Sequence, residues 1–225
     1  MRYYPINLDI KNRKCLVVGG GGVGTRKVIT LVECGADVTV VSYTFSKKLL
    51  ELADSNSITF KKRAYQTSDL NGMFLVIGAT DNENLNNKIS IDAKHFNMLC
   101  NIADRPKVCN FILPAIVTRG DLLISISTSG KSPAFAKKMR KKLENEFGEE
   151  YAQFLQLMGA IRKKLLGQAH EPEAHKNLFE KTINEKLKNK GVIEMIRENN
   201  KKDINILLFK IFGQGFEYDI LMKTN

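Results

Sequence analysis

Along the first half of the chain, short apolar runs alternate with segments whose apolar residues recur at helical spacing. This pattern predicts a succession of strands and helices. Short apolar runs rich in Val, Ile and Leu indicate buried strands, and the third run alternates as a half-exposed strand does. Apolar residues at helical spacing predict helices over 22–34 and 83–96, the first closed by Gly35. The predicted strands are 14–19, 37–42, 57–63, 73–79 and 98–103. This order is typical of an α/β fold with a doubly wound parallel sheet.

The pattern changes after the fifth predicted strand. Runs over 111–117 and 121–127 predict two further strands, and Ser132-Pro133 is a typical start for the basic helix that follows them. From about Phe147 onward the apolar residues recur at helical spacing. We therefore expect a nucleotide-binding domain over 1–113, a small strand–helix element over 114–146 and a helical C-terminal part over 147–225.

Composition indicates which kinds of ligand the protein attracts and in which compartment it is found. The 225 residues include 35 Lys and Arg against 24 Asp and Glu, a formal net charge of +11 that attracts nucleic acid, an acidic membrane face, or polycarboxylate and phosphate ligands. None of the four cysteines forms a Cys-x-x-Cys pair, so reduced thiols are expected rather than disulfides or metal ligands. Neither a signal-peptide core nor a membrane-length apolar run is present, which predicts a cytoplasmic protein with no membrane span.

The stretch VVGGGGVGTRK (17–27) places four consecutive glycines between a predicted strand and a predicted helix. Gly19, Gly21 and Gly24 fit G-x-G-x-x-G, in which the first glycine permits a tight turn, the second lets the backbone approach a pyrophosphate and the third lets helix and strand pack closely. A flexible hinge would not require this strand–turn–helix context. The stretch therefore predicts a dinucleotide-binding turn with phosphates at a helix N-terminus.

One part of that fingerprint is missing. An acidic residue is expected after the second strand to hold the ribose 2′-OH, but the chain has Ser42, Tyr43 and Thr44 there, and Asp37 lies at the other end of the strand. The residues therefore leave NAD and NADP both open. The lack of an arginine beside Ser42 favours NAD slightly.

Two further stretches could serve chemistry in the same crevice. Asp104 follows the fifth strand, where it could act on a ligand or could simply serve as a turn or helix-cap residue. Thr128, Ser129, Gly130 and Lys131 precede a helix start, where hydroxyls, free amides and a cation could bind an anion or merely cap the helix. The glycine of a full P-loop motif is absent.

HEPEAH (170–175) has two His and two Glu, but Pro172 argues against one continuous helix carrying both imidazoles. We interpret it as a solvated loop between helices, and no metal site is predicted. The basic run KKMRKK (137–142) is typical of a solvated helix face, although it directly follows the anion-friendly loop.

Three segments in this order and spacing resemble the siroheme synthase N-terminal module: YYPINLDIKNRKCLVVGGGGVGTRK, NIADRPKVCNFILPAIV and ISISTSGKSPAFAKKMRKKLE. This family comprises precorrin-2 dehydrogenases, some of which are also sirohydrochlorin ferrochelatases. The resemblance is specific to about Glu144 and general beyond it.

The resemblance implies a homodimer with a Rossmann-type domain, a dimerisation element over 114–146 and a helical tail. It implies NAD-dependent oxidation of precorrin-2 to sirohydrochlorin, with Fe²⁺ as a further substrate in bifunctional members. The family's essential aspartate falls on Asp104, and its substrate loop falls on Thr128, Ser129, Gly130 and Lys131. The expected cofactor contacts are Gly19, Gly21, Gly22, Val23, Gly24, Tyr43, Thr44 and Thr80.

The resemblance agrees with the residues, because a polycarboxylate tetrapyrrole suits a basic protein. An NAD-binding regulatory module without catalysis is the alternative. It would explain the glycines but not Asp104 or the basic loop and helix. Nucleic-acid binding ranks last, since the basic stretches lack a recognition motif or an aromatic stacking platform.

Overall fold

The computed structural model describes residues 3–52, 58–167 and 172–223. The chain divides into two compact units, Met1–Leu113 and Pro114–Asn225, and each is described by itself.

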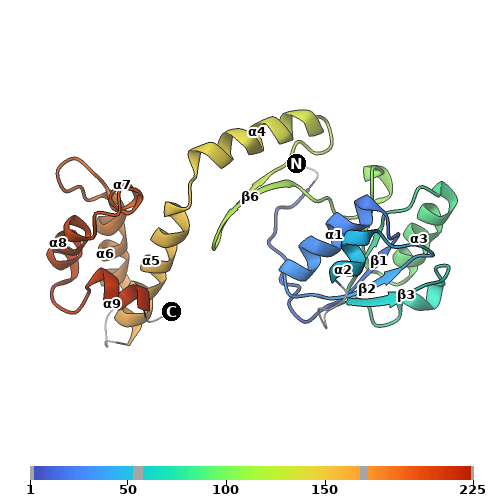
Figure 1. Ribbon diagram of the computed structural model, residues 1–225, viewed down its shortest axis with the longest axis horizontal. Helices are drawn as coiled ribbons and strands as arrows, with labels where there is room; N and C mark the ends of the chain where they lie inside the picture. Colours follow the sequence, from blue (N-terminus) through green and yellow to red (C-terminus); the bar gives the residue numbers. More distant parts are fainter. Residues whose placement is uncertain (1–2, 53–57, 168–171, 224–225) are drawn as a thin grey trace. The chain divides into compact units, whose positions relative to one another are not determined.

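The first unit is a five-stranded parallel sheet flanked by helices (Figure 1), so the predicted α/β doubly wound fold is confirmed. The strand order is β3-β2-β1-β4-β5. The strands are β1 (Lys14–Val18), β2 (Asp37–Val41), β3 (Ile58–Lys61), β4 (Leu75–Gly78) and β5 (Leu99–Ile102). The helices are α1 (Gly22–Glu33), α2 (Lys47–Glu51) and α3 (Glu83–His95).

The sheet has a separate apolar core on each face because its central strands are buried on both sides. Val17 of β1 packs with Val28 of α1 in one core. Leu16 packs with Ile89 and Ala93 of α3 in the other. Parallel strands covered by helices on both faces read as continuous apolar runs, which is why the sequence pattern located them. Two short 3₁₀ turns, η2 (Thr67–Leu70) and η3 (Pro106–Val108), have no such periodicity and were not predicted.

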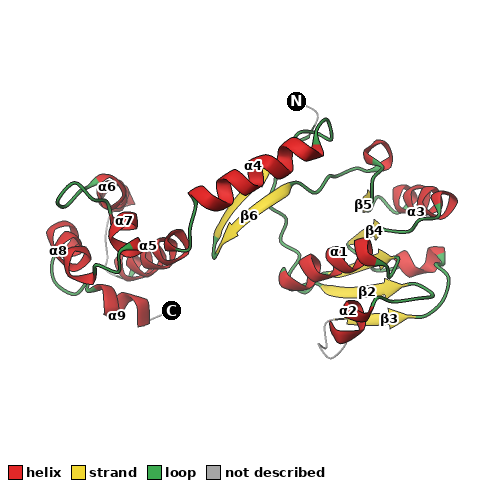
Figure 2. Ribbon diagram, turned by 45° about the horizontal axis from the view of Figure 1, so that its top comes forward, coloured by secondary structure: helices red, strands yellow, loops and turns green. Residues whose placement is uncertain are grey.

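The second unit begins with an antiparallel pair, β6 (Ala115–Arg119) and β7 (Leu122–Ile126), followed by α4 (Pro133–Glu146), which lies along the pair (Figure 2). The side chain of Ser132 caps α4 by accepting the N–H of Phe135, as its sequence predicts. The predicted strand over 111–117 is wrong in its first half. Pro114 has no N–H to donate to a neighbouring strand. The carbonyl of Phe111 instead accepts a hydrogen bond from the side chain of Asn101.

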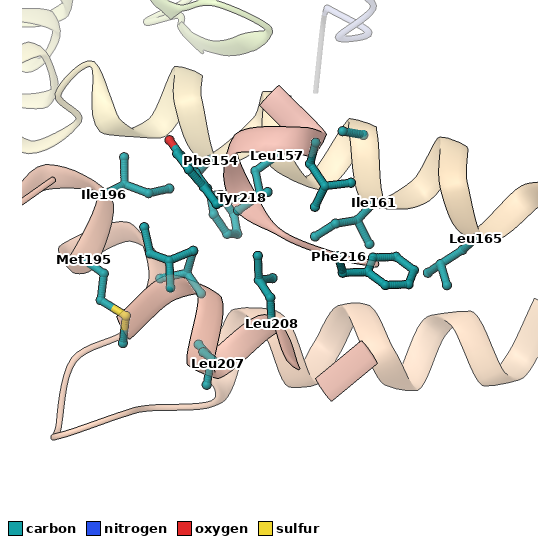
Figure 3. Close-up of a cluster of buried hydrophobic side chains, with 14 residues drawn as sticks. Phe154, Leu157, Ile161, Leu165, Met195, Ile196, Leu207, Leu208, Phe216 and Tyr218 are labelled. Atoms are coloured by element: carbon teal, nitrogen blue, oxygen red, sulfur yellow. The ribbon is translucent and has the colours of Figure 1, made fainter. Parts of the chain in front are cut away.

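The rest of the unit is helical, with its own apolar core. Leu157 and Ile161 of α5 point toward Leu207 and Leu208 of α8 (Figure 3). Phe147, where the C-terminal helical pattern was expected to begin, lies outside α5 and is the C-cap of α4. The helices are α5 (Glu150–Leu166), α6 (Pro172–Asn184), α7 (Val192–Arg197), α8 (Lys201–Phe212) and α9 (Tyr218–Lys223).

The predicted loop over 170–175 is wrong in its second half, because α6 already begins at Pro172. Proline lacks the N–H that the first helical turn leaves unused, so it starts a helix as readily as it interrupts one. His170 and Glu171 lie outside the described residues. Among the helices that the structure describes, none has the length and apolar character needed to cross a bilayer.

Candidate dinucleotide-binding and catalytic site

The predicted site residues of the first unit lie at one edge of its sheet. All five strands are parallel, so the loops that follow them share the carboxyl edge. The glycine stretch follows β1, Tyr43 and Thr44 follow β2, Thr80 follows β4 and Asp104 follows β5. The chain runs from β1 to β2 on one side and from β4 to β5 on the other. This is the switch point at which open α/β sheets bind ligands.

Three glycines of the turn are required by the protein's own packing. Gly19 has a φ of +117°, and a Cβ there would lie 2.3 Å from the carbonyl oxygen of Ala79. A Cβ on Gly24 would lie 2.0 Å from the carbonyl oxygen of Gly19, so only glycine lets α1 start this close to β1. Gly20 is equally constrained, since its Cβ would lie 2.1 Å from the carbonyl oxygen of Thr44.

Gly21 and Gly22 differ from these three because a Cβ on either would meet no described atom within 4 Å. Gly21 is the N-cap of α1 in an extended conformation, and no side chain caps the first turn. The backbone amides at the start of α1 therefore face a surface that the protein leaves uncovered. An open, side-chain-free helix N-terminus is what a pyrophosphate requires, so the residues fit a bound dinucleotide.

Polar contacts join the glycine turn to the loop after β2. The N–H of Ser46 donates to the carbonyl of Gly20 at 2.9 Å, and the Ser46 hydroxyl lies 2.7 Å from that of Thr25 on α1. Sequence reasoning missed Thr25 and Ser46; the one available signal was the helix-capping potential of Ser46 before α2. Tyr43 in this loop is 67% exposed and free to contact a ligand.

Thr80, after β4, is fixed by Asn86 of α3. Its hydroxyl lies 2.8 Å from Asn86 Oδ1, and Asn86 Nδ2 donates to its carbonyl at 2.8 Å. The Thr80 methyl group would be 3.3 Å from a Cβ on Gly19, which places this threonine against the glycine turn. The structure therefore brings Thr80 and the glycine turn together.

Two basic residues, the last residue of β3 and one just after it, lie near the end of β2, and sequence reasoning missed them too. Lys61 pairs with Val41 across the strands, and Lys61 and Arg63 both bind the carboxylate of Asp69. Burial alone would raise the pKa of this carboxyl. Hydrogen bonds from Arg63, the Gln66 N–H and Lys61 outweigh burial and hold the pKa far below its ordinary value. Asp69 therefore stays ionised and forms ion pairs with both cations.

Asp104 is exposed just beyond β5, with a left-handed φ of +59°. Its carboxylate makes no hydrogen bond or ion pair with the residues that the structure describes. It does act electrostatically on Lys27 of α1, the helix that begins at the glycine turn. Burial lowers the pKa of Lys27, Arg26 lowers it further, and the charge of Asp104 opposes both. The predicted catalytic carboxylate thus lies within electrostatic range of the dinucleotide-binding helix.

The loop over Thr128–Lys131 belongs to the second unit and joins β7 to α4. Ser129 and Gly130 are both left-handed, which makes a tight turn. The expectation of free amides is wrong at three positions. The N–H of Ser129 binds the Ser127 hydroxyl, that of Lys131 binds the Thr128 carbonyl, and that of Ser132 binds the Thr128 hydroxyl. Lys131 remains exposed at the tip.

The described residues contain no group of three or more His, Cys, Asp or Glu that could hold a metal ion. Within the same part of the chain the four cysteines are free thiols.

Together, the parallel sheet, its switch point and the glycine turn define a Rossmann-type dinucleotide-binding protein. Comparison with known families shows which dinucleotide-binding proteins this chain resembles. Residues 6–115 match a family described as putative NAD(P)-binding, and residues 119–146 match the central domain of sirohaem biosynthesis proteins. The predicted cofactor class and the resemblance to the siroheme synthase family are confirmed.

Relatives extend the match beyond these domains. The chain is 34% identical to a siroheme synthase of Ruthia magnifica over 208 residues, which are 92% of this chain and 44% of that protein. It is 39% identical to one of Vesicomyosocius okutanii over 165 residues, 73% of this chain and 35% of that protein. The chain thus spans less than half the length of these relatives. A solved structure named SirC, precorrin-2 dehydrogenase, matches with a TM-score of 0.73 and 27% identity, covering 89% of this chain and all of that one.

Proposed function

We propose that this chain is an NAD-dependent dehydrogenase that oxidises precorrin-2 to sirohydrochlorin. The observation that carries the proposal is the match to a precorrin-2 dehydrogenase structure over that protein's entire length. The glycine turn supports it, because Gly21 and Gly22 leave room for phosphates that no protein side chain fills. The Asp104 carboxylate at the same sheet edge, which has no hydrogen-bond or ion-pair partner among the described residues, supports it further.

Each group then has a separate task. The amides at the start of α1 bind the dinucleotide phosphates, and the loop after β2 lies beside its ribose. Bound NAD⁺ supplies the hydride acceptor. The substrate loses two electrons with that hydride and one further proton, and Asp104 accepts the proton as the general base. An exposed carboxylate with no internal hydrogen bond is free to approach the substrate and then release the proton to water.

The basic cluster after β3 supports NAD over NADP. A 2′-phosphate is normally bound by a free arginine near the end of the second strand. Here Arg63 and Lys61 are already paired with a buried carboxylate, Asp69, whose side chain is 1% exposed. Both cations are therefore held in ion pairs with Asp69, which weakens their attraction for a 2′-phosphate.

The second unit would bind the acidic substrate. Lys131 is exposed at its loop tip, and the exposed Lys137, Lys138, Lys141 and Lys142 follow on α4. A polycarboxylate tetrapyrrole is attracted by such a field. We further propose that the protein works as a cytoplasmic homodimer.

The decisive experiment is anaerobic incubation of the purified protein with precorrin-2 and NAD⁺. We expect NADH and the sirohydrochlorin spectrum to appear at equal rates. A protein that binds NAD⁺ but never produces NADH would support the regulatory-module alternative and overturn the dehydrogenase. Repeating the reaction with NADP⁺ tests the cofactor preference, and a higher kcat/KM with NADP⁺ would contradict it.

Iron insertion into sirohydrochlorin is the second candidate function, favoured by the relatives named siroheme synthase. Fe²⁺ would be a substrate, and Asp104 could take the pyrrole protons that must leave as the metal enters. The test supplies Fe²⁺ or Co²⁺ and sirohydrochlorin without NAD⁺. A rate equal to that of a protein-free control removes this activity and leaves the dehydrogenase intact.

A further inference from the structure

The segment that carries Asp104 leaves β5, turns and runs back beside the same strand. On its return, the N–H of Asn110 donates to the carbonyl of Cys100 at 3.2 Å. Asn101 of β5 donates through Nδ2 to the carbonyl of Phe111 at 3.0 Å. Residues 103–109 are thus a closed loop, here called the aspartate loop, with Asp104 near its beginning.

The thiol of Cys109 joins the two ends of the aspartate loop. Its sulfur accepts the N–H of Ile102 at 3.1 Å, and it lies 3.1 Å from the carbonyl of Arg105, to which it can donate. Ile102 and Arg105 stand on either side of Asp104 and its neighbour, so this one side chain spans the turn. Burial raises the pKa of Cys109, although the hydrogen bond from Ile102 opposes the shift, so the group remains a thiol that both accepts and donates.

Asn110 supplies the hydrogen bonds that a sixth strand would make. Its Oδ1 accepts the N–H of Cys100 at 2.8 Å, and its Nδ2 donates to the carbonyl of Met98 at 2.7 Å. These are peptide groups on the open edge of β5, which would otherwise face solvent or stay unpaired. The carboxamide therefore fastens the returning segment to the sheet.

A clamp of this kind is needed because Asp104 has a left-handed φ of +59°. This conformation costs most residues with a Cβ on the order of 1–2 kcal/mol; Asp adopts it more readily than most, and the neighbouring hydrogen bonds hold Asp104 in it. Arg105 adds an anchor on α3 through Glu83 at 2.5 Å. Within the described residues nothing bonds to the Asp104 carboxylate itself, so its direction depends on the backbone that these neighbours hold.

We propose that Cys109 and Asn110 are positioning residues for the Asp104 carboxylate, holding the aspartate loop by side-chain-to-backbone hydrogen bonds. The inference rests on the proposed dehydrogenase function for its kinetic consequence. The thiol acts as a hydrogen-bonding hub, with no nucleophilic or redox step. Reactive groups misplaced by about 1 Å can lose on the order of 100-fold in rate, so loss of either clamp should appear in kcat.

The test compares Cys109→Ala, Cys109→Ser and Asn110→Ala, with Cys34→Ser as the matched control. Cys34 is an exposed thiol at the end of α1, outside the aspartate loop. We expect both alanine variants to lose at least tenfold in kcat while KM for NAD⁺ and the affinity for NADH stay within twofold. Serine can both donate and accept, so it should restore part of the rate. If the two residues merely stabilised the fold, kcat and the affinities for NAD⁺ and NADH would all decrease together. Serine and alanine at position 109 would then have the same effect.

Amide hydrogen exchange gives a readout independent of activity. Exchange should accelerate at least tenfold at the Ile102 amide in Cys109→Ala and at the Cys100 amide in Asn110→Ala, because these side chains accept those N–H groups, and it should remain unchanged in Cys34→Ser. Should the wild type show no turnover, the proposed function fails, and the exchange data alone decide this inference. Unchanged exchange in both alanine variants overturns it. With an active wild type, kcat values within twofold of it in both alanine variants overturn it as well.

Discussion

Gly21 and Gly24 lie three residues apart at the start of α1, yet the same substitution to alanine should affect a different property of the protein at each. At Gly21 a new Cβ meets no described atom within 4 Å, and the extended backbone with φ of −78° accepts alanine without strain. At Gly24 the new Cβ would lie 2.0 Å from the carbonyl oxygen of Gly19. The first site is open toward the proposed ligand, and the second is filled by the protein itself.

The magnitudes follow from these two environments. Alanine is a poorer N-cap than glycine by roughly 0.5 kcal/mol, and its lower unfolded-state entropy offsets about the same amount, so Gly21→Ala should leave the free energy of unfolding nearly unchanged. If the methyl group displaces one charged phosphate contact, about 1.5–3 kcal/mol of binding is lost, which is roughly a 10- to 150-fold weaker affinity for NAD⁺. At Gly24 the backbone must move, which costs about 1–3 kcal/mol of stability or more.

Two measurements separate these outcomes. Urea unfolding followed by circular dichroism gives the free energy of unfolding, and calorimetric titration gives the affinity for NAD⁺. Gly21→Ala should bind weakly and unfold like the wild type, whereas Gly24→Ala should unfold at lower urea. Wild-type affinity in a stable Gly21→Ala variant would refute the placement of the phosphates. Wild-type stability in Gly24→Ala would refute the close packing of α1 on β1.

Three further predictions concern other residues of the two units. Asp104→Asn should lower kcat for precorrin-2 oxidation roughly 10²- to 10⁴-fold with unchanged NAD⁺ affinity, and full activity in the anaerobic assay would contradict the assigned base. Asp69→Asn should lower the free energy of unfolding by about 3 kcal/mol at neutral pH, because it leaves Lys61 and Arg63 without their buried partner. The depressed pKa of Asp69 means that the wild type keeps this stabilisation above about pH 4 and loses it as pH falls further; urea titrations from pH 7 to 3 should show a shallower acid loss in the variant. Ser132→Ala removes the α4 cap and should cost about 1 kcal/mol, seen as faster amide exchange in the first turn of α4, with no change in NAD⁺ affinity.

The predictable part of the fold is the part in which local pattern and tertiary burial agree. The strands of the parallel sheet are apolar on both faces, so each appeared as an uninterrupted run in the sequence. Gly35 ends α1 with a φ of +77°, which the helix-stop signal anticipated. The glycine turn was recognisable because its neighbours along the chain, a strand and a helix, are also its neighbours in space.

The errors arose where one residue type permits two structures. Pro172 starts α6, although proline was interpreted as breaking a helix there. Phe111 belongs to an apolar run, but its carbonyl is bound by Asn101, and β6 begins only at Ala115. The amides before α4 were expected to be free, yet the hydroxyls of Ser127 and Thr128 bind two of them. In each case a specific hydrogen bond or steric fit decided the outcome, and hydrophobic periodicity carries no information about it.

The cofactor preference shows the same limit at the site itself. Along the chain, no arginine lies beside Ser42. In the sheet, the relevant neighbour of the β2 end is β3, which brings Lys61 and Arg63 from about twenty residues away. These cations would favour a 2′-phosphate if they were free. In the proposal made above they do not act that way, because Asp69, buried in the turn that follows, pairs with both of them. The preference for NAD that we propose therefore depends on an ion-pair network between β3 and η2, and changing Asp69 should alter cofactor selectivity as well as stability.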